Sequence, residues 1–263
     1  MILPHDDLGE GPTLVLLHAG VADRTMWSEL LGPLSQAGYR VIALDLPGYG
    51  EAPLPLEQEA PWLDVAETLD ALAVERVALV GNSFGGAVAQ RVALLQPERL
   101  WAMALISSPD EEMEPSPELR SVWEAEEAAL ELEDLDGAVQ IVIEAWTLPD
   151  APARLRMRVA AMQRRALEIQ IQDGETPPGP DPLELDPKAL RGLKLPVLVA
   201  YGERDMVDFH GAAERLAAAI PGARTEVIAG AGHLSPLERP QAFSHLLLAF
   251  LAEVRAREGQ AAR

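Results

Sequence analysis

Short apolar runs alternate with longer amphipathic segments along this chain, and that alternation restricts the fold more than any other feature. The runs are nearly continuous in Val, Leu, Ile and Ala, as expected of parallel strands that helices cover on both faces. They are Thr13–His18, Tyr39–Leu44, Arg76–Gly81, Leu100–Ile106, Pro196–Tyr201 and Arg224–Ala229. Helical segments lie between them, at about Arg24–Gln36, Leu63–Ala73, Phe84–Leu95, Phe209–Ala219 and from Pro240 onward. The pattern predicts an α/β fold with a doubly wound, mostly parallel sheet, to which Met1–Leu8 could add an antiparallel edge strand.

About ninety residues between the strands that end near Ser107 and begin near Pro196 carry no strand signal. They show three apolar stripes at helical spacing, namely Leu155, Val159, Met162, Ala166 and Ile169, then Leu119, Val122, Trp123 and Leu130, and finally Val139, Val142 and Trp146. Pro-rich stretches at 109–117 and 177–187 frame this unit. We therefore expect a helical cap, or lid, over residues 110–186, inserted between the two parts of the sheet domain at 1–109 and 187–263.

Composition limits the function. The chain of 263 residues is 48% hydrophobic and has no cysteine, which rules out disulfides, a thiol nucleophile and thiolate metal sites. A net charge of −21 would repel nucleic acid and anionic membranes, so neither is expected as a partner. The start of the chain lacks the pattern of a signal peptide, and no apolar run reaches the roughly 20 residues that span a bilayer. A soluble, cytoplasmic protein is expected, and a homodimer is left open.

The charge is unevenly spread. Residues 110–150 hold 14 Asp and Glu against one Arg, a net of −13, whereas residues 151–172 hold five Arg against one Glu, a net of +4. Charge runs usually mark solvated faces, which favours two helix surfaces that attract one another over a docking surface.

The strongest local motif is Gly81-Asn82-Ser83-Phe84-Gly85-Gly86, which directly follows an apolar run and precedes a helical segment. A G-x-S-x-G sequence in a strand–turn–helix context exposes its serine on a tight turn, at the sheet edge where open α/β sheets build their sites. Ser83 is therefore the candidate nucleophile, although a Gly-rich turn with an inert serine would show the same letters.

A serine hydroxyl needs an adjacent base, and His233 is the candidate among five histidines. It stands in a small-residue loop, Ala229-Gly230-Ala231-Gly232-His233, after the last strand. The orienting acid should leave another strand and fall between serine and histidine in the chain, which Asp205 does. Asp208 and Asp110 remain alternatives, because triads are defined by geometry rather than by position.

A tetrahedral intermediate needs two amide donors. The N–H of Phe84, directly after the serine, is one candidate, and the N–H of Gly20 in His18-Ala19-Gly20 is the other.

Taken together, these motifs resemble the α/β-hydrolase superfamily along nearly the whole chain. The resemblance also includes Asp45-Leu46-Pro47-Gly48-Tyr49-Gly50, Gly202-Glu203-Arg204-Asp205 and Glu238-Arg239-Pro240. Ala19 departs from it, since the family usually has glycine there. Within the superfamily, Asp23, Met26 and Trp27 together with the His233–Glu238 loop are most similar to the enol-lactonase and small-esterase group.

The sequence therefore predicts a serine hydrolase that cleaves a carboxylic ester or a lactone of a small molecule through an acyl-enzyme. No cofactor and no metal are expected. Candidate pocket residues from the cap are Trp123, Val142, Trp146 and Met162. Two alternatives remain: a carbon–carbon hydrolase of the meta-cleavage type, whose Gly-Asn-Ser elbow is similar but which usually has Trp soon after the histidine, and a small-molecule receptor on the same fold.

Overall fold

The computed structural model describes residues 1–174 and 176–261, and its centre is a seven-stranded sheet. The strands are β1 His5–Leu8, β2 Thr13–Leu17, β3 Arg40–Leu44, β4 Val77–Asn82, β5 Leu100–Ile106, β6 Val197–Gly202 and β7 Arg224–Ile228. Their order is β1-β3-β2-β4-β5-β6-β7, and only β1 runs antiparallel, at the edge beside β3. In the middle of the sheet Val15 of β2 lies between Ile42 of β3 and Leu79 of β4. The expected doubly wound, mostly parallel sheet is confirmed, including its antiparallel edge strand.

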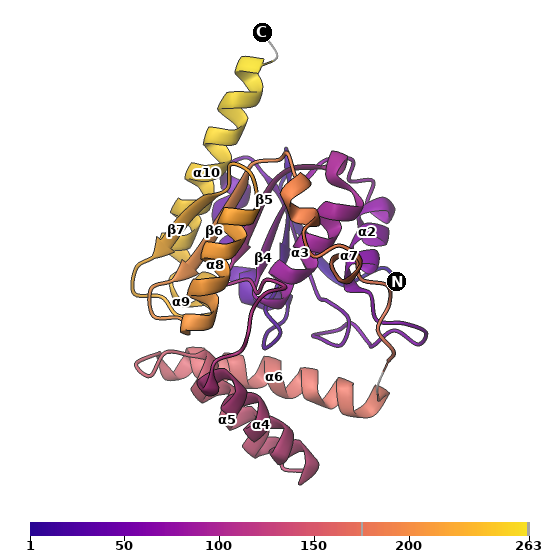
Figure 1. The fold of residues 1–263 in the computed structure, drawn as a ribbon, viewed down its shortest axis with the longest axis vertical. Helices are drawn as coiled ribbons and strands as arrows, with labels where there is room; N and C mark the ends of the chain where they lie inside the picture. Colours follow the sequence, from indigo (N-terminus) through magenta and orange to yellow (C-terminus); the bar gives the residue numbers. More distant parts are fainter. Residues whose placement is uncertain (175, 262–263) are drawn as a thin grey trace.

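Helices cover both faces of this sheet (Figure 1). One face packs on α2 Pro61–Ala71, α3 Phe84–Leu95 and α8 Val207–Ala219, and the other on α1 Ser28–Gln36 and α10 Pro240–Ala261. Because successive strand residues point to opposite faces, Val15 joins the first core and Leu14 the second. Burial on both sides explains why β2 to β6 are apolar at nearly every position, whereas the edge strands β1 and β7 carry charged and exposed residues. Short helices complete this part, namely η1 Arg24–Trp27, η2 Pro97–Arg99, η3 Ala189–Gly192 and α9 Ser235–Glu238.

Three long helices separate β5 from β6 in the sequence: α4 Pro117–Glu131, α5 Leu135–Trp146 and α6 Ala153–Asp173. A short helix, α7 Pro182–Leu185, then leads the chain back beside α3. The apolar stripe of α6 is a buried helical face, as its spacing predicts, and Val159 and Met162 join the core that contains Trp27. In Figure 1 the three helices lie together at one end of the molecule, opposite the free end of α10.

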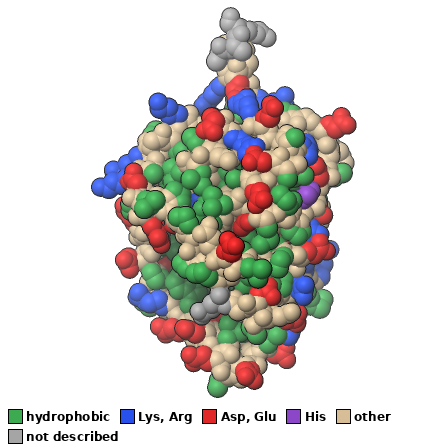
Figure 2. All heavy atoms as spheres, turned by 90° about the vertical axis from the view of Figure 1, so that its right-hand side faces the viewer, with side chains coloured by type: hydrophobic (Ala, Val, Ile, Leu, Met, Phe, Trp, Pro, Cys, Tyr) green, Lys and Arg blue, Asp and Glu red, His purple; other side chains and the backbone are tan. Residues whose placement is uncertain are grey.

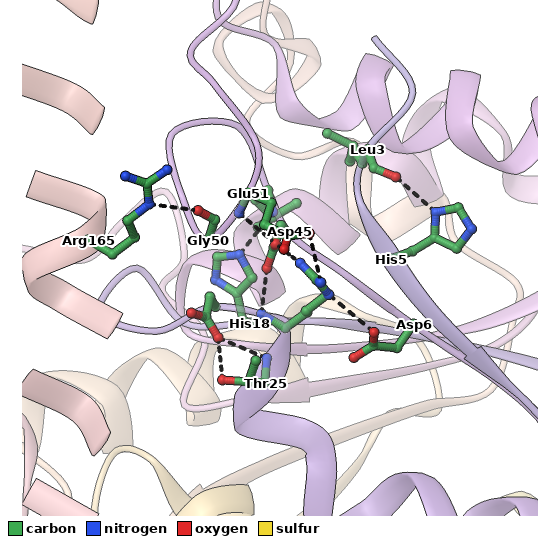
Figure 3. Close-up of polar contacts among 12 residues, drawn as sticks. Leu3, His5, Asp6, His18, Thr25, Asp45, Gly50, Glu51 and Arg165 are labelled. Carbon is green, nitrogen blue, oxygen red and sulfur yellow. Dashed lines mark hydrogen bonds and ion pairs between the residues drawn. The ribbon is translucent and has the colours of Figure 1, made fainter. Parts of the chain in front are cut away.

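Hydrogen bonds from α6 tie these helices to the loops of the sheet domain. Arg158 donates to the carbonyl of Thr25 and to the Ser28 hydroxyl (2.7 Å), and Arg165 donates to the carbonyl of Gly50 (3.2 Å, Figure 3). Asp45, also in Figure 3, fixes the same loops by accepting the N–H groups of Arg24 (2.7 Å) and Glu51 (2.9 Å).

The acidic and basic stretches form fewer ion pairs with one another than their opposite charges suggest. Among the described residues, Arg164 with Asp136 is the one ion pair that joins the basic stretch of α6 to the acidic stretch of α4 and α5. Acidic side chains instead gather at the exposed lower end of the molecule in Figure 2, where α4 and α5 lie. Arg158 and Arg165 of α6 instead bind carbonyl and hydroxyl groups of the sheet domain, so the expected attraction between the two stretches accounts for little of the contact.

No helix in the described ranges is both long enough and apolar enough to cross a membrane.

Candidate active site

Ser83 lies between β4 and α3 on a strained turn. Its backbone has φ 52° and ψ −115°, a conformation that costs a non-glycine residue on the order of 1–3 kcal/mol. The flanking glycines make the turn possible: a Cβ on Gly81 would lie 2.2 Å from the carbonyl oxygen of Gly85, and one on Gly85 would lie 2.2 Å from that of Leu17. The serine therefore stands at the carboxyl end of β4 and at the amino terminus of α3, where the helix dipole favours negative charge.

Asn82 ties this turn to the loop that carries His233. Its side-chain amide is fully buried and donates to the carbonyl oxygens of Ile106 and His233, each at 3.1 Å. Sequence reasoning assigned no role to Asn82. The available signal was a polar residue at the end of an otherwise apolar strand, since a buried amide requires partners.

His233 and Asp205 are in direct contact. The Nδ1 atom of His233 lies 3.0 Å and 3.2 Å from the two carboxylate oxygens of Asp205, and both residues are at least nine-tenths buried. The backbone N–H of Met206 also donates to Asp205 (2.8 Å). Such a carboxylate fixes the tautomer of the ring and leaves Nε2 free to accept a proton.

The two alternative acids have other partners. Asp110 forms a two-fold ion pair with Arg215 of α8, at 2.7 and 2.8 Å. Asp208 accepts both the backbone N–H (2.6 Å) and the hydroxyl (2.9 Å) of Ser116, the residue that caps α4. Both acids therefore anchor the start of the helical insertion to α8.

The other histidines are occupied elsewhere or exposed. His18 is fully buried; its Nδ1–H donates to the carbonyl of Ala19 (2.8 Å), and its Nε2 accepts the N–H of Leu46 (2.9 Å). Burial lowers the pKa of His18, which agrees with a neutral ring that holds two loops together. His5 and His210 each contact a backbone carbonyl, and His245 lies exposed on α10.

Two aromatic side chains hold the imidazole of His233. The ring of Trp146, at the end of α5, lies 4.5 Å from it and the ring of Phe209, in α8, lies 4.3 Å from it, centroid to centroid. Trp146 was expected to contact substrate, and Phe209 was given no role. The period-3.6 pattern shows that such residues face inward but not which neighbour they meet.

A cavity of about 420 Å³ has Ser83 and His233 in its wall. Gly20 and Phe84 line it as well. The N–H of Gly85 donates to the carbonyl of His18 (3.0 Å), whereas those of Gly20 and Phe84 have no acceptor among the described residues. Tyr49 lies beside Gly20: its hydroxyl is 3.4 Å from the position that a Cβ on Gly20 would occupy. Burial raises the pKa of the Tyr49 hydroxyl to about 12. This end of the cavity presents neutral donors.

Of the four cap residues expected in the pocket, two line the cavity and two lie elsewhere. Trp123 and Trp146 line the cavity. Val142 does not: it is fully buried behind Trp146, in a cluster with Leu119 and Phe209. Met162 also lies elsewhere: its sulfur accepts a hydrogen bond from the Thr25 hydroxyl (3.5 Å), where α6 contacts η1. In the described ranges, no three His, Asp or Glu side chains converge as a metal-binding group.

Comparison with known proteins gives the family. The model of the alpha/beta hydrolase fold family matches residues 12–240. The chain therefore belongs to the α/β-hydrolase family, in agreement with its motifs, and is a hydrolase.

The relatives differ in the bond they cleave. The chain is 27% identical to carboxylesterase YbfK of Bacillus subtilis (92% of this chain, 81% of the relative). It is 28% identical to a 2-hydroxy-6-oxononadienedioate/2-hydroxy-6-oxononatrienedioate hydrolase of Escherichia coli (94% and 90%). It is 38% identical to a 2-hydroxy-6-oxo-6-phenylhexa-2,4-dienoate hydrolase of Comamonas testosteroni, but this match covers 40% of this chain and 39% of that one.

Solved structures support the same family. Est816, described as an N-acyl homoserine lactone degrading enzyme, superposes with a TM-score of 0.75 at 27% identity and covers 94% of this chain and 96% of its own. The enol-lactonase of Burkholderia xenovorans LB400 reaches 0.77 at 24% identity, with 95% and 96% covered. The expected similarity to the esterase and enol-lactonase group is confirmed at the level of the fold.

Proposed function

We propose that this hydrolase cleaves a carboxylic ester or a lactone through an acyl-enzyme formed on Ser83. The observation that carries the proposal is that Ser83 and His233 line one cavity while Asp205 contacts His233 from behind, at 3.0 Å. A strained serine that shares a cavity with a histidine whose tautomer is fixed is the arrangement expected to activate a hydroxyl.

In the proposed reaction, the Ser83 hydroxyl attacks the carbonyl carbon while Nε2 of His233 takes its proton. The N–H groups of Gly20 and Phe84 bind the oxyanion, and His233 then protonates the leaving alkoxide. Water, deprotonated by His233, attacks the acyl-enzyme and releases the acid. Asp205 stabilises the charged imidazolium at both stages.

The cavity wall favours esters over the carbon–carbon substrates of some relatives. Those substrates are named as a dienoate and dienedioates, which are carboxylates. The described residues that line this cavity include neither Lys nor Arg, and they include the carboxylate of Glu126. An anionic substrate would therefore be desolvated without a partner charge, which is costly.

Residues 110–186 act in this proposal as a cap. Trp123, Trp146 and Gln163 come from its helices and line the cavity. The cap excludes water from the carbonyl and limits substrate size, while the groups that react belong to the sheet domain.

A substrate panel tests the proposal. We expect turnover of p-nitrophenyl acetate and butyrate and of γ- and δ-lactones, with no cleavage of a 2-hydroxy-6-oxodienoate. Cleavage of the dienoate without ester turnover would assign the site to carbon–carbon hydrolysis. Tight binding of an ester or lactone without any turnover would make the protein a receptor.

A further inference from the structure

The wall of the cavity is mostly apolar, and the cap adds three polar side chains to it. Phe84, Trp146 and Phe209 lie close to Ser83 and His233. Glu126 of α4 and Gln163 and Gln170 of α6 line the cavity among apolar cap residues such as Leu130 and Leu167. The cap therefore contributes a group of oxygen and nitrogen atoms to a pocket whose catalytic end needs none of them.

These three polar side chains are largely occupied with one another and with the backbone. The side-chain amide of Gln163 donates to one carboxylate oxygen of Glu126 (3.2 Å), and that of Gln170 donates to the carbonyl of Gly48 (3.4 Å). Gln163 is only 4% exposed, and its carbonyl oxygen is buried with no donor among the described residues. The second carboxylate oxygen of Glu126 likewise has no donor there. The Gln163 oxygen is closed off from the cavity, whereas the second Glu126 oxygen is not, so Glu126 is the acceptor that a ligand with its own N–H or O–H group can reach. Gln163 holds the other oxygen of Glu126 in place.

The charge of the pocket points to the same ligand. Glu126 is half-buried, and burial raises the pKa of its carboxyl group, so an adjacent cation would favour the charged form. Neither Lys nor Arg is found among the described lining residues, and the whole chain carries −21. A field of this sign raises the local concentration of cations and lowers that of anions.

We propose that Glu126, held in place by Gln163, binds a hydrogen-bond donor at the far end of the substrate, with ammonium preferred over hydroxyl and carboxylate rejected. The inference rests on the proposed ester hydrolysis at Ser83 and names its substrate class: esters that carry an amino or hydroxyl group several bonds from the scissile carbonyl. Glu126 is a specificity residue here and Gln163 a positioning residue, and neither touches the reacting atoms.

Four methyl esters of matched length test this preference by pH-stat at pH 7.5: methyl 6-aminohexanoate, methyl 6-hydroxyhexanoate, methyl heptanoate and monomethyl pimelate. Acetate esters with the same end groups on the alcohol side repeat the series for the opposite orientation. In one of the two series we expect kcat/KM to fall from ammonium to hydroxyl to carboxylate, by on the order of 100-fold overall, because hydrogen bonds to charged groups are the stronger ones.

Two variants locate the effect. Glu126→Gln and Gln163→Met should each reduce the ammonium-to-carboxylate ratio by about tenfold or more. Glu127→Gln is the matched control, since Glu127 lies exposed on the same helix and its loss removes the same charge; the ratio should stay as in the wild type.

The outcomes separate the two proposals. Hydrolysis of methyl heptanoate with no preference among end groups in either series, or with carboxylate preferred, would overturn the role of Glu126 and leave the ester hydrolase intact. An equal loss of the ratio in Glu127→Gln would show a long-range effect of net charge and overturn it as well. Failure to hydrolyse any ester of either series would contradict the proposed function itself.

Discussion

The sheet domain and the helical insertion differ sharply in how much side chain they bury. Every residue of β2, β4 and β5 is buried, and the turns that follow β2, β4 and β6 carry Gly20, Ser83 and Asp205. In α4, by contrast, Leu119 is the one buried residue of fifteen; the insertion has one small apolar cluster of its own and shares a second with Phe209 of α8. Elements with few buried contacts open more readily. The groups proposed for catalysis therefore lie on the well-packed sheet domain, and those proposed for specificity lie on the less buried insertion.

The largest effect should follow from a change within the sheet domain. Asp205→Asn keeps the size of the side chain but favours the wrong tautomer of His233, so kcat should fall by up to about 10⁴-fold. Asp110→Asn and Asp208→Asn are the matched controls, because these acids hold Arg215 and Ser116 instead; each should change kcat by less than about tenfold. Steady-state kinetics on p-nitrophenyl butyrate measures all three. If Asp110→Asn gave the larger loss, the acid would have to be reassigned.

Two tryptophans of the insertion should behave differently. Trp146 contacts the His233 ring as well as the cavity, so Trp146→Ala should lower kcat/KM for acetate and octanoate esters alike, by about 10- to 100-fold, since small displacements of a catalytic group are costly. Trp123 is 44% exposed and lines the cavity without contacting His233, so Trp123→Ala should affect the octanoate ester alone, by about tenfold.

Parallel losses of activity on both esters in both tryptophan variants, or no change in either variant, would contradict the expected difference. The insertion would then not shape the pocket.

A moderate effect is expected where the two regions are joined. Arg158→Ala removes hydrogen bonds from α6 to Thr25 and Ser28 and should lower the free energy of unfolding by about 1–2 kcal/mol. Arg154→Ala, one turn earlier on the same helix, removes an exposed arginine and should change it by less than about 0.5 kcal/mol. Urea unfolding followed by tryptophan fluorescence provides the comparison. Equal stability of the two variants would mean that the Arg158 hydrogen bonds contribute nothing to holding the insertion on the sheet domain.

The smallest effect concerns Glu238, which lies behind the His233 loop and accepts the N–H of Gly232 at 2.5 Å. Burial raises the pKa of Glu238 in the folded protein, so the folded state binds more protons than the unfolded one at pH values between the two pKa values. Its contribution is therefore fully present below the unfolded pKa, near 4.5, and is lost as the pH rises. Glu238→Gln keeps an acceptor for Gly232 without titrating.

The melting temperature of Glu238→Gln relative to wild type should therefore increase from pH 5 to pH 8. A constant difference across that range would show that Glu238 titrates as an ordinary exposed carboxyl.

The sequence predicted most of the sheet domain because its signals are local. Continuous apolar runs mark strands that are covered on both faces, and β2 to β7 begin and end within one residue of the expected bounds, whereas β1 begins at His5 rather than at Met1. Ser83 stood out because its turn demands glycine at fixed offsets, and His233 because it follows a small-residue loop in the chain order serine, acid, histidine.

Contacts between distant segments were not readable. Asn82 with the His233 loop, Phe209 with the His233 ring, and Glu126 with Gln163 each join residues far apart in the chain. Val142 and Met162 show why: an apolar stripe has the same period whether it faces a substrate cavity or the protein core. In this chain Val142 packs against Trp146, and Met162 contacts Thr25 of η1.

The most direct test of the central claim is covalent labelling of the nucleophile. A fluorophosphonate probe should add one adduct to the wild-type protein, and peptide mass spectrometry should locate it on Ser83. Ser83→Ala should retain the folded circular dichroism spectrum, take up no probe and lose ~10³-fold or more in kcat. An adduct on another serine, or near-wild-type ester turnover by the folded alanine variant, would contradict the account.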